Sequence, residues 1–282
     1  MGLNQPVKEI LIARETIEGA GVRLHRAFGY HEIPRFDPFL MLDDFRGDSP
    51  ADYLKGFPWH PHRGIETVTY MLEGKVEHGD SIGNSGIVGA GAVQWMTAGS
   101  GIIHQEMPKP VDGKMGGFQL WVNLPRSQKY HVPRYQEISP DMIPVDTLEN
   151  GSKVRVIAGT YGRLTGPVRE IIVDPECLDV SVPANSKFYH QVRPGFTGIM
   201  YVFEGRCTVG VGDPVFLKNR NLALLAPGTV LDLTSGEDGC RFLWISGKPI
   251  GEPIAWGGPI VMNTKEEVDQ AFTEYQNGTF IK

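Results

Sequence analysis

Two histidines one residue apart, His60 and His62, lie in the run PWHPHRGIETVTYMLEG at residues 58–74. On a β-strand, residues i and i+2 point to the same side, with Cα atoms roughly 6.5–7 Å apart. Two imidazoles on one side of a strand can occupy adjacent positions around a metal ion. Histidine is uncommon in this chain, with 8 in 282 residues. The pair therefore indicates a metal site, if further ligands lie nearby.

A second pair with the same spacing, His104 and Glu106, lies in GSGIIHQEMP, about forty residues after the first. If the two strands meet in a barrel, they present three nitrogen atoms and one carboxylate oxygen. That set suits a divalent first-row transition metal. We expect one ion per chain, and the ligand types leave Fe(II), Mn, Ni, Cu, Co and Zn open. An ion that prefers five or six ligands keeps positions open for water, O2 or a substrate.

Glu66 is a competing carboxylate, because it stands four residues after His62. Both Glu66 and Glu106 lie an even number of residues from a nearby histidine. If the strands stay regular, each shares a strand face with that histidine, so the spacing alone does not decide between them. Gly64 could introduce a bulge and change the register for Glu66. We therefore predict Glu106 as the ligand and assign Glu66 to the pocket wall or to the layer behind the ligands.

The elements that must position these residues are predicted to be strands. Short runs rich in Val, Ile, Thr and aromatic residues recur between Gly, Pro, Asn and Asp, which is typical of an all-β chain. One helix is expected near the end of the chain, where Thr264 and Glu267 form a capping box before an apolar stripe. We expect that helix to pack on a sheet without a catalytic role.

The two halves of the chain resemble each other. TYMLEGKVEHG at residues 69–79 matches MYVFEGRCTVG at residues 200–210, which predicts an internal duplication. We expect a metal-binding domain at 1–135, a linker at 136–153 and a second domain at 154–282. When the two halves are aligned on this repeat, Gln191 and Arg193 correspond to His60 and His62. The second copy is therefore predicted to bind no metal.

Composition excludes several other classes of protein. The net charge of −6, without a Lys/Arg-rich run, argues against direct nucleic-acid binding. The uncharged run at residues 81–103 contains too many glycines for a membrane span. Three cysteines without CxxC spacing and an N-terminus without an apolar signal segment predict a reduced, cytoplasmic protein. We also expect a monomer.

HPHRGIETVTYMLEG resembles the first cupin motif, and GSGIIHQE resembles the second, with Gly99 in place of its usual proline. Together with FDPFLMLDDFRG and MTAGSGIIHQEMP, these runs resemble the pirin family. The resemblance implies two tandem cupin (jelly-roll-like) β-barrels with the metal in the N-terminal one. The family's ligand positions fall on His60, His62, His104 and Glu106.

The resemblance implies a metal-dependent dioxygenase that cleaves a flavonol of the quercetin type with O2. Glu106, or Glu66 nearby, is the candidate to take the hydroxyl proton of this small aromatic substrate. Phe57, Trp59, Trp95 and Met96 are candidate walls for a flat ring. The alternative is a non-catalytic, metal-binding regulatory protein that acts through protein partners, and a cupin-type isomerase is a third option.

Overall fold

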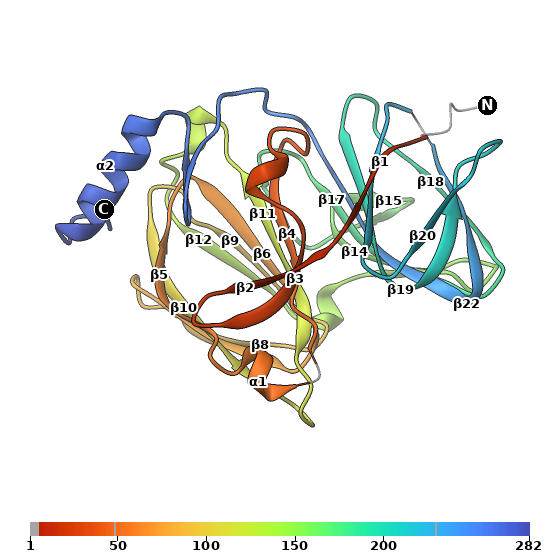
Figure 1. The fold of residues 1–282 in the computed structure, drawn as a ribbon, viewed down its shortest axis with the longest axis horizontal. Helices are drawn as coiled ribbons and strands as arrows, with labels where there is room; N and C mark the ends of the chain where they lie inside the picture. Colours follow the sequence, from red (N-terminus) through yellow and green to blue (C-terminus); the bar gives the residue numbers. More distant parts are fainter. Residues whose placement is uncertain (1–5, 48, 229) are drawn as a thin grey trace. The chain divides into compact units, whose positions relative to one another are not determined.

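The structure, a computed structural model, describes residues 6–282 except 48 and 229. β-Strands make up most of the described chain, and short helices connect them (Figure 1). The predicted all-β fold is confirmed. Contacts between Cα atoms divide the chain into two compact units. The first unit combines Arg14–Pro140 with Ile250–Lys282, and the second combines the described residues up to Ala13 with Asp141–Pro249.

The first unit contains two larger antiparallel sheets and a two-stranded one. The larger one has the strand order β12 (Arg134–Ile138), β9 (Val93–Thr97), β6 (Ile65–Glu73), β11 (Gly116–Asn123), β4 (Phe39–Asp44), β3 (Val22–Phe28) and β2 (Arg14–Glu18). The smaller one has the order β5 (Phe57–His62), β10 (Ile102–Lys109), β7 (Lys75–Asp80) and β8 (Ser85–Gly89). Both sheets contribute to one buried apolar cluster, whose members include Leu24, Met71, Val76 and Val88.

Short helical segments connect the strands of this unit. They are α1 (Pro50–Tyr53) and the 3-10 turns η1 (Tyr30–Glu32) and η2 (Arg126–Gln128). The β5 and β10 strands contain the two pairs of predicted ligands, so the strand prediction at both places is confirmed.

The end of the chain also belongs to the first unit. It forms the hairpin of β23 (Ala255–Gly257) and β24 (Ile260–Met262), followed by α2 (Lys265–Gln276). Thr264 caps α2 as predicted: its hydroxyl accepts from the Glu267 amide, and the Glu267 side chain accepts from the Thr264 amide. Val268 and Ala271 bury the apolar face of α2 against β24. Figure 1 shows α2, the blue helix, beside strands from the first half of the chain.

The second unit is built on one large antiparallel sheet. Its main path is β1 (Val7–Ile12), β21 (Asn221–Leu225), β19 (Thr197–Val209), β22 (Val230–Gly247), β17 (Glu176–Val182), β14 (Lys153–Ala158) and β13 (Val145–Thr147). Four further strands and one turn are β15 (Thr160–Tyr161), β16 (Leu164–Thr165), β18 (Lys187–Gln191), β20 (Val215–Lys218) and η3 (Pro140–Met142). A large apolar cluster fills this unit and contains Phe188, Phe242 and Trp244.

The two units differ from the predicted division at both ends of the chain. The main crossing, at Pro140 and Asp141, falls inside the predicted linker 136–153. However, β1 pairs with β21 of the second unit, whereas residues 250–282 join the first unit. β1 covers an edge that β21 would otherwise expose, and an exposed edge leaves backbone hydrogen-bonding groups unpaired. The local pattern of β1 does not reveal which edge it joins.

Candidate metal centre

His60, His62 and His104 converge because β5 and β10 are adjacent antiparallel strands. His104 lies directly opposite His60 in the strand register, and Ile102 lies opposite His62. One ring nitrogen from each histidine lies within 4.8 Å of the others. Burial lowers the pKa of His60, lowers that of His62 to about 3, and lowers that of His104 well below its ordinary value. All three imidazoles are therefore neutral at pH 7, the form that binds a metal.

Hydrogen bonds fix the tautomers of the first two rings. His60 Nδ1 lies 2.9 Å from the Pro58 carbonyl oxygen, and His62 Nδ1 lies 3.0 Å from that of Pro259. A carbonyl only accepts, so both Nδ1 atoms must carry the hydrogen. Both Nε2 atoms then present lone pairs, although they lie only 3.1 Å apart. A cation between the two Nε2 atoms would remove the repulsion between their lone pairs. The lowered pKa values of His60 and His62 argue against a proton as that cation.

His104 provides a second test of the fit. Its side chain is 1% exposed, and neither ring nitrogen has a hydrogen-bond partner among the described residues. A buried polar atom without a partner is costly, and buried polar groups are almost always satisfied. A divalent ion bound by the three imidazoles would satisfy one of these nitrogens, so the residues present fit the metal.

Glu106 lies beside the three histidines but outside their group. The register of β5 and β10 shifts after His104, so that Glu106 lies opposite Phe57. The strand was expected to be regular between His104 and Glu106. The register shift between them changes which residue of β5 lies opposite Glu106. The Glu106 carboxylate contacts Thr69 Oγ1 at 3.1 Å and lines the cavity described below. Its role as a fourth ligand stays a prediction.

Glu66 faces the other side of the sheet. It lies on β6, three residues from Thr69, and residues an odd number apart on a strand point to opposite faces. Its carboxylate accepts hydrogen bonds from Thr97 Oγ1 at 2.7 Å and Trp95 Nε1 at 3.1 Å. Glu66 is not among the described residues that line the cavity, so its placement in the pocket wall needs correction.

The reason is the turn at Gly64. This residue has a φ of +78° and lies between β5 and β6, which belong to different sheets. A Cβ there would lie 2.0 Å from the Val261 carbonyl oxygen, so only glycine fits. The chain therefore turns at Gly64 into another sheet, which is a larger change than the predicted bulge. The spacing between His62 and Glu66 then no longer tells which face Glu66 takes.

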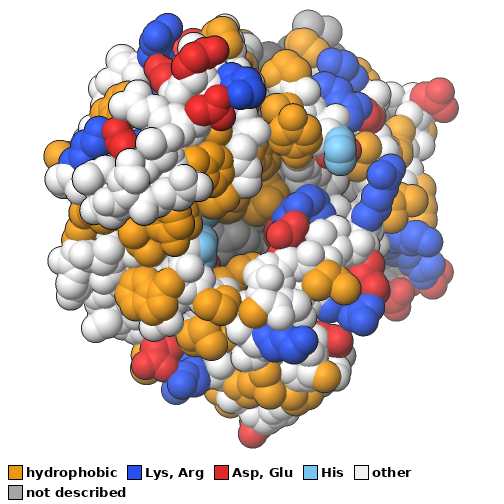
Figure 2. Space-filling model, turned by 60° about the vertical axis from the view of Figure 1, so that its left-hand side comes forward, with side chains coloured by type: hydrophobic (Ala, Val, Ile, Leu, Met, Phe, Trp, Pro, Cys, Tyr) orange, Lys and Arg blue, Asp and Glu red, His pale blue; other side chains and the backbone are white. Residues whose placement is uncertain are grey.

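His60 and His62 line a cavity of about 710 Å³. Figure 2 shows a hollow surrounded largely by apolar side chains, with a histidine visible inside it. Phe57 and Trp59 line the cavity as predicted, but Trp95 and Met96 do not; both are fully buried in the core. The remaining walls include Tyr30, Met41, Tyr53, Met115, Trp121 and Trp256. Such a cavity accommodates a flat aromatic molecule.

Charged groups in the cavity are mainly acidic. Arg26 is bound by both oxygens of Asp43, at 2.8 Å each, and by Glu18 at 2.8 Å. With Glu106, the cavity lining holds three carboxyl groups and one guanidinium among the described residues. Arg26 is therefore neutralised by its neighbours and does not make an anion site.

Several contributors to this site have no signal in the sequence. Trp121 packs edge-on against His62 at a centroid distance of 5.1 Å, and Trp256 lies 5.8 Å from Trp121. Gln119 lies 2.9 Å from Thr69 Oγ1. Pro259, whose carbonyl oxygen orients His62, stands 197 residues away from it. Only the fold brings these groups together.

Comparison with known proteins assigns a family to the chain. The family model described as Pirin matches residues 21–122, and that of the Pirin C-terminal cupin domain matches residues 177–281. A pirin-like protein of Caulobacter vibrioides is 45% identical over 277 residues, 98% of this chain and 99% of that protein. The chain is a member of the pirin family. The predicted fold of two cupin domains is thereby confirmed.

Solved structures agree with this assignment. A quercetin 2,3-dioxygenase from Acinetobacter baumannii matches this pirin with a TM-score of 0.89 and 32% identity, and the match covers 98% of each chain. A bacterial pirin from Escherichia coli, solved in complex with nickel(II), matches with a TM-score of 0.65 and 22% identity over 86% of this chain and 99% of that one.

The second cupin domain has other residues at the positions that correspond to the histidine pair. Gln191 ends β18, and Arg193 forms an ion pair with Asp174. The three cysteines of the chain lie buried in this domain without disulfide bonds. No helix in the described part of the chain is long and apolar enough to cross a membrane.

Proposed function

We propose that this pirin is a metal-dependent dioxygenase that opens the ring of a flavonol such as quercetin with O2. The observation that carries the proposal is the group of three neutral imidazoles, two of which, His60 and His62, line a large cavity with aromatic walls. His60, His62 and His104 would hold the ion, with Fe(II) as the expected metal. The ion would act as a Lewis acid that favours the anionic form of the flavonol 3-hydroxyl.

Glu106 would accept the hydroxyl proton. Burial raises its pKa to about 7, and the hydrogen bond from Thr69 opposes that effect. Thr69 Oγ1 has one hydrogen and two acceptors, Glu106 and Gln119, so it can serve only one of them at a time. A protonated Glu106 would donate to Thr69, which would then donate to Gln119. The three side chains can therefore hold the proton within the cavity.

The cavity supports an uncharged aromatic substrate more than an aromatic carboxylate. Trp59, Trp121 and Trp256 offer flat apolar surfaces. The carboxyl groups of Glu18 and Asp43 can accept hydrogen bonds from phenolic hydroxyls, whereas they would repel an anion. Cleavage places both atoms of O2 in the ester product and releases one ring carbon as CO, so no further oxidant is required.

The test is an assay of metal-loaded protein with quercetin in air, which records loss of the flavonol and release of CO. We expect turnover with quercetin and little with an aromatic carboxylate of similar size. Protein that carries one metal per chain but consumes no flavonol would contradict the proposal, and would favour the non-catalytic regulatory role.

A further inference from the structure

The residue after His62 connects the metal centre to the far end of the chain. The side chain of Arg63 is 1% exposed and makes three hydrogen bonds. Nε donates to the Ser100 carbonyl oxygen at 2.6 Å, Nη1 to Glu274 Oε2 at 2.7 Å, and Nη2 to the Phe280 carbonyl oxygen at 2.8 Å. The guanidinium also stacks 4.2 Å above the Phe280 ring. Each of its three nitrogen atoms therefore donates at least one hydrogen bond, and one face of the cation packs on an aromatic ring.

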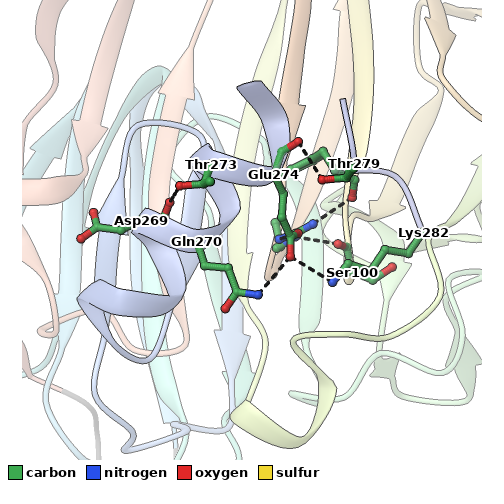
Figure 3. Close-up of polar contacts among 9 residues, drawn as sticks. Ser100, Asp269, Gln270, Thr273, Glu274, Thr279 and Lys282 are labelled. Atoms are coloured by element: carbon green, nitrogen blue, oxygen red, sulfur yellow. Dashed lines mark hydrogen bonds and ion pairs between the residues drawn. The ribbon is translucent and has the colours of Figure 1, made fainter. Parts of the chain in front are cut away.

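Two of these partners belong to residues 250–282, here called the C-terminal strap. Figure 3 shows Glu274 on α2 at the centre of this network, with Ser100, Gln270 and Lys282 around it. Gln270 and Lys282 donate to the other carboxylate oxygen of Glu274, at 3.0 and 3.3 Å. Glu274 thus connects α2 to the β5 strand through Arg63.

The strap also contacts Arg63, the residue that follows β5, through its backbone. The Val261 amide donates to the Arg63 carbonyl oxygen at 3.1 Å, and Arg63 forms a parallel bridge with Ile260. One residue earlier on each segment, the Pro259 carbonyl oxygen accepts from His62 Nδ1 at 3.0 Å. The contact that orients His62 is therefore a continuation of the contacts that hold the strap.

The strap is held by these polar contacts together with the apolar packing of its buried residues. Its strands β23 and β24 form a separate two-stranded sheet, without a place in either larger sheet of the described unit. Lys129 provides a second tie, because its ammonium donates to the carbonyl oxygens of Gly64 and Val261 at 2.9 and 2.8 Å. If the Arg63 tie is loosened, the Pro259 carbonyl oxygen can move away from His62.

We propose that Arg63 and Glu274 are positioning residues for the metal centre: their ion pair locks the strap so that the Pro259 carbonyl oxygen holds the His62 imidazole in its metal-binding orientation. The inference rests on the proposed metal site. Partners that orient a ligating histidine typically change metal affinity 10–100-fold when they are lost.

The test compares Glu274→Gln and Arg63→Lys with Asp269→Asn. Asp269 is a matched control, because it lies on the same helix and pairs with Lys265 in solvent at 2.6 Å. Glu274→Gln removes the charge but keeps the shape, whereas Arg63→Lys keeps the charge but loses the planar guanidinium that reaches the three acceptors and stacks on the Phe280 ring. Each variant is titrated with Ni(II), and the visible spectrum is recorded with Co(II) bound. Melting of the metal-free protein is measured in parallel.

We expect the Ni(II) Kd to rise about tenfold in Glu274→Gln and Arg63→Lys, with an altered Co(II) spectrum, and neither to change in Asp269→Asn. Lower melting temperatures with wild-type Kd values and spectra would reduce the ion pair to a structural contact and overturn the inference. If the wild-type protein itself fails to bind Ni(II) or Co(II), the metal site is wrong instead, so the two failures are distinguishable.

Discussion

The Nε2 atoms of His60 and His62 lie 3.1 Å apart, and both rings must carry their hydrogen on Nδ1. Two lone pairs thus face each other inside a buried site. This relationship favours a cation between the rings, and His104 could supply a third nitrogen from the adjacent strand. Local hydrogen bonding therefore supports the candidate metal site, in addition to the spacing of the histidines.

The first prediction concerns stoichiometry. Purified protein should bind close to one divalent ion per chain, and His60→Ala combined with His104→Ala should bind almost none, because two of the three converging nitrogens are removed. Metal analysis of identically purified proteins measures this. Two ions per chain, or an ion retained by the double variant, would place the site elsewhere.

The second prediction separates the two carboxylates. Glu106→Gln should weaken metal binding by about tenfold or more if the carboxylate reaches the ion, and should abolish flavonol turnover. Glu66→Gln should keep the metal, because Glu66 faces Trp95 and Thr97 on the other side of the sheet. That variant should instead lose about 1–3 kcal/mol of stability, since its amide cannot accept from both donors as well as a carboxylate does.

Metal content, turnover and denaturant unfolding of the two variants are the measurements. Full metal in Glu106→Gln together with depleted metal in Glu66→Gln would reverse the assignment. Full metal in Glu106→Gln with turnover lost would leave Glu106 as the proton acceptor alone.

The third prediction concerns removal of the metal. Chelation should abolish activity but leave the β-sheet circular dichroism signal intact, because each unit has its own buried apolar cluster. Metal at a hundredfold excess over its Kd adds about 2.7 kcal/mol to the stability of the native state, so the melting temperature should fall only modestly. Unfolding on chelation at room temperature would contradict this expectation.

The fourth prediction concerns Lys129, whose ammonium contacts Asn123 Oδ1 at 2.5 Å in addition to two carbonyl oxygens. Burial lowers its pKa to about 7, whereas an unfolded lysine titrates near 10.4. Between these values the unfolded state binds more protons, so stability rises with pH. The free energy of unfolding, relative to Lys129→Met, should increase by up to about 1.4 kcal/mol per pH unit from pH 7 to 10.

Urea unfolding of the wild-type protein and Lys129→Met across this range tests the slope. Methionine has a side chain of similar length but no donor, so three acceptors lose the hydrogen bond from Lys129. The variant should therefore be the less stable protein throughout. A difference that is constant from pH 7 to 10 would show that Lys129 stays charged.

Much of the site could be predicted from the sequence, because strand geometry is local. A period of two residues places His60 with His62 on one side, and the adjacent strand β10 then needs only to bring His104 opposite His60. The capping box at Thr264 is likewise a contact between neighbours in the sequence, and α2 begins where it predicts. These features depend on separations of a few residues, so the sequence determined them.

The tertiary structure decided the rest, because it depends on which distant segments meet. The turn at Gly64 sends β6 into another sheet, so strand parity from His62 does not apply to Glu66. The exchange of β1 and residues 250–282 between the two units depends on which sheet edge and which apolar face are free. The hydrogen bond from His62 to Pro259 spans 197 residues, and no local pattern encodes a contact of that range.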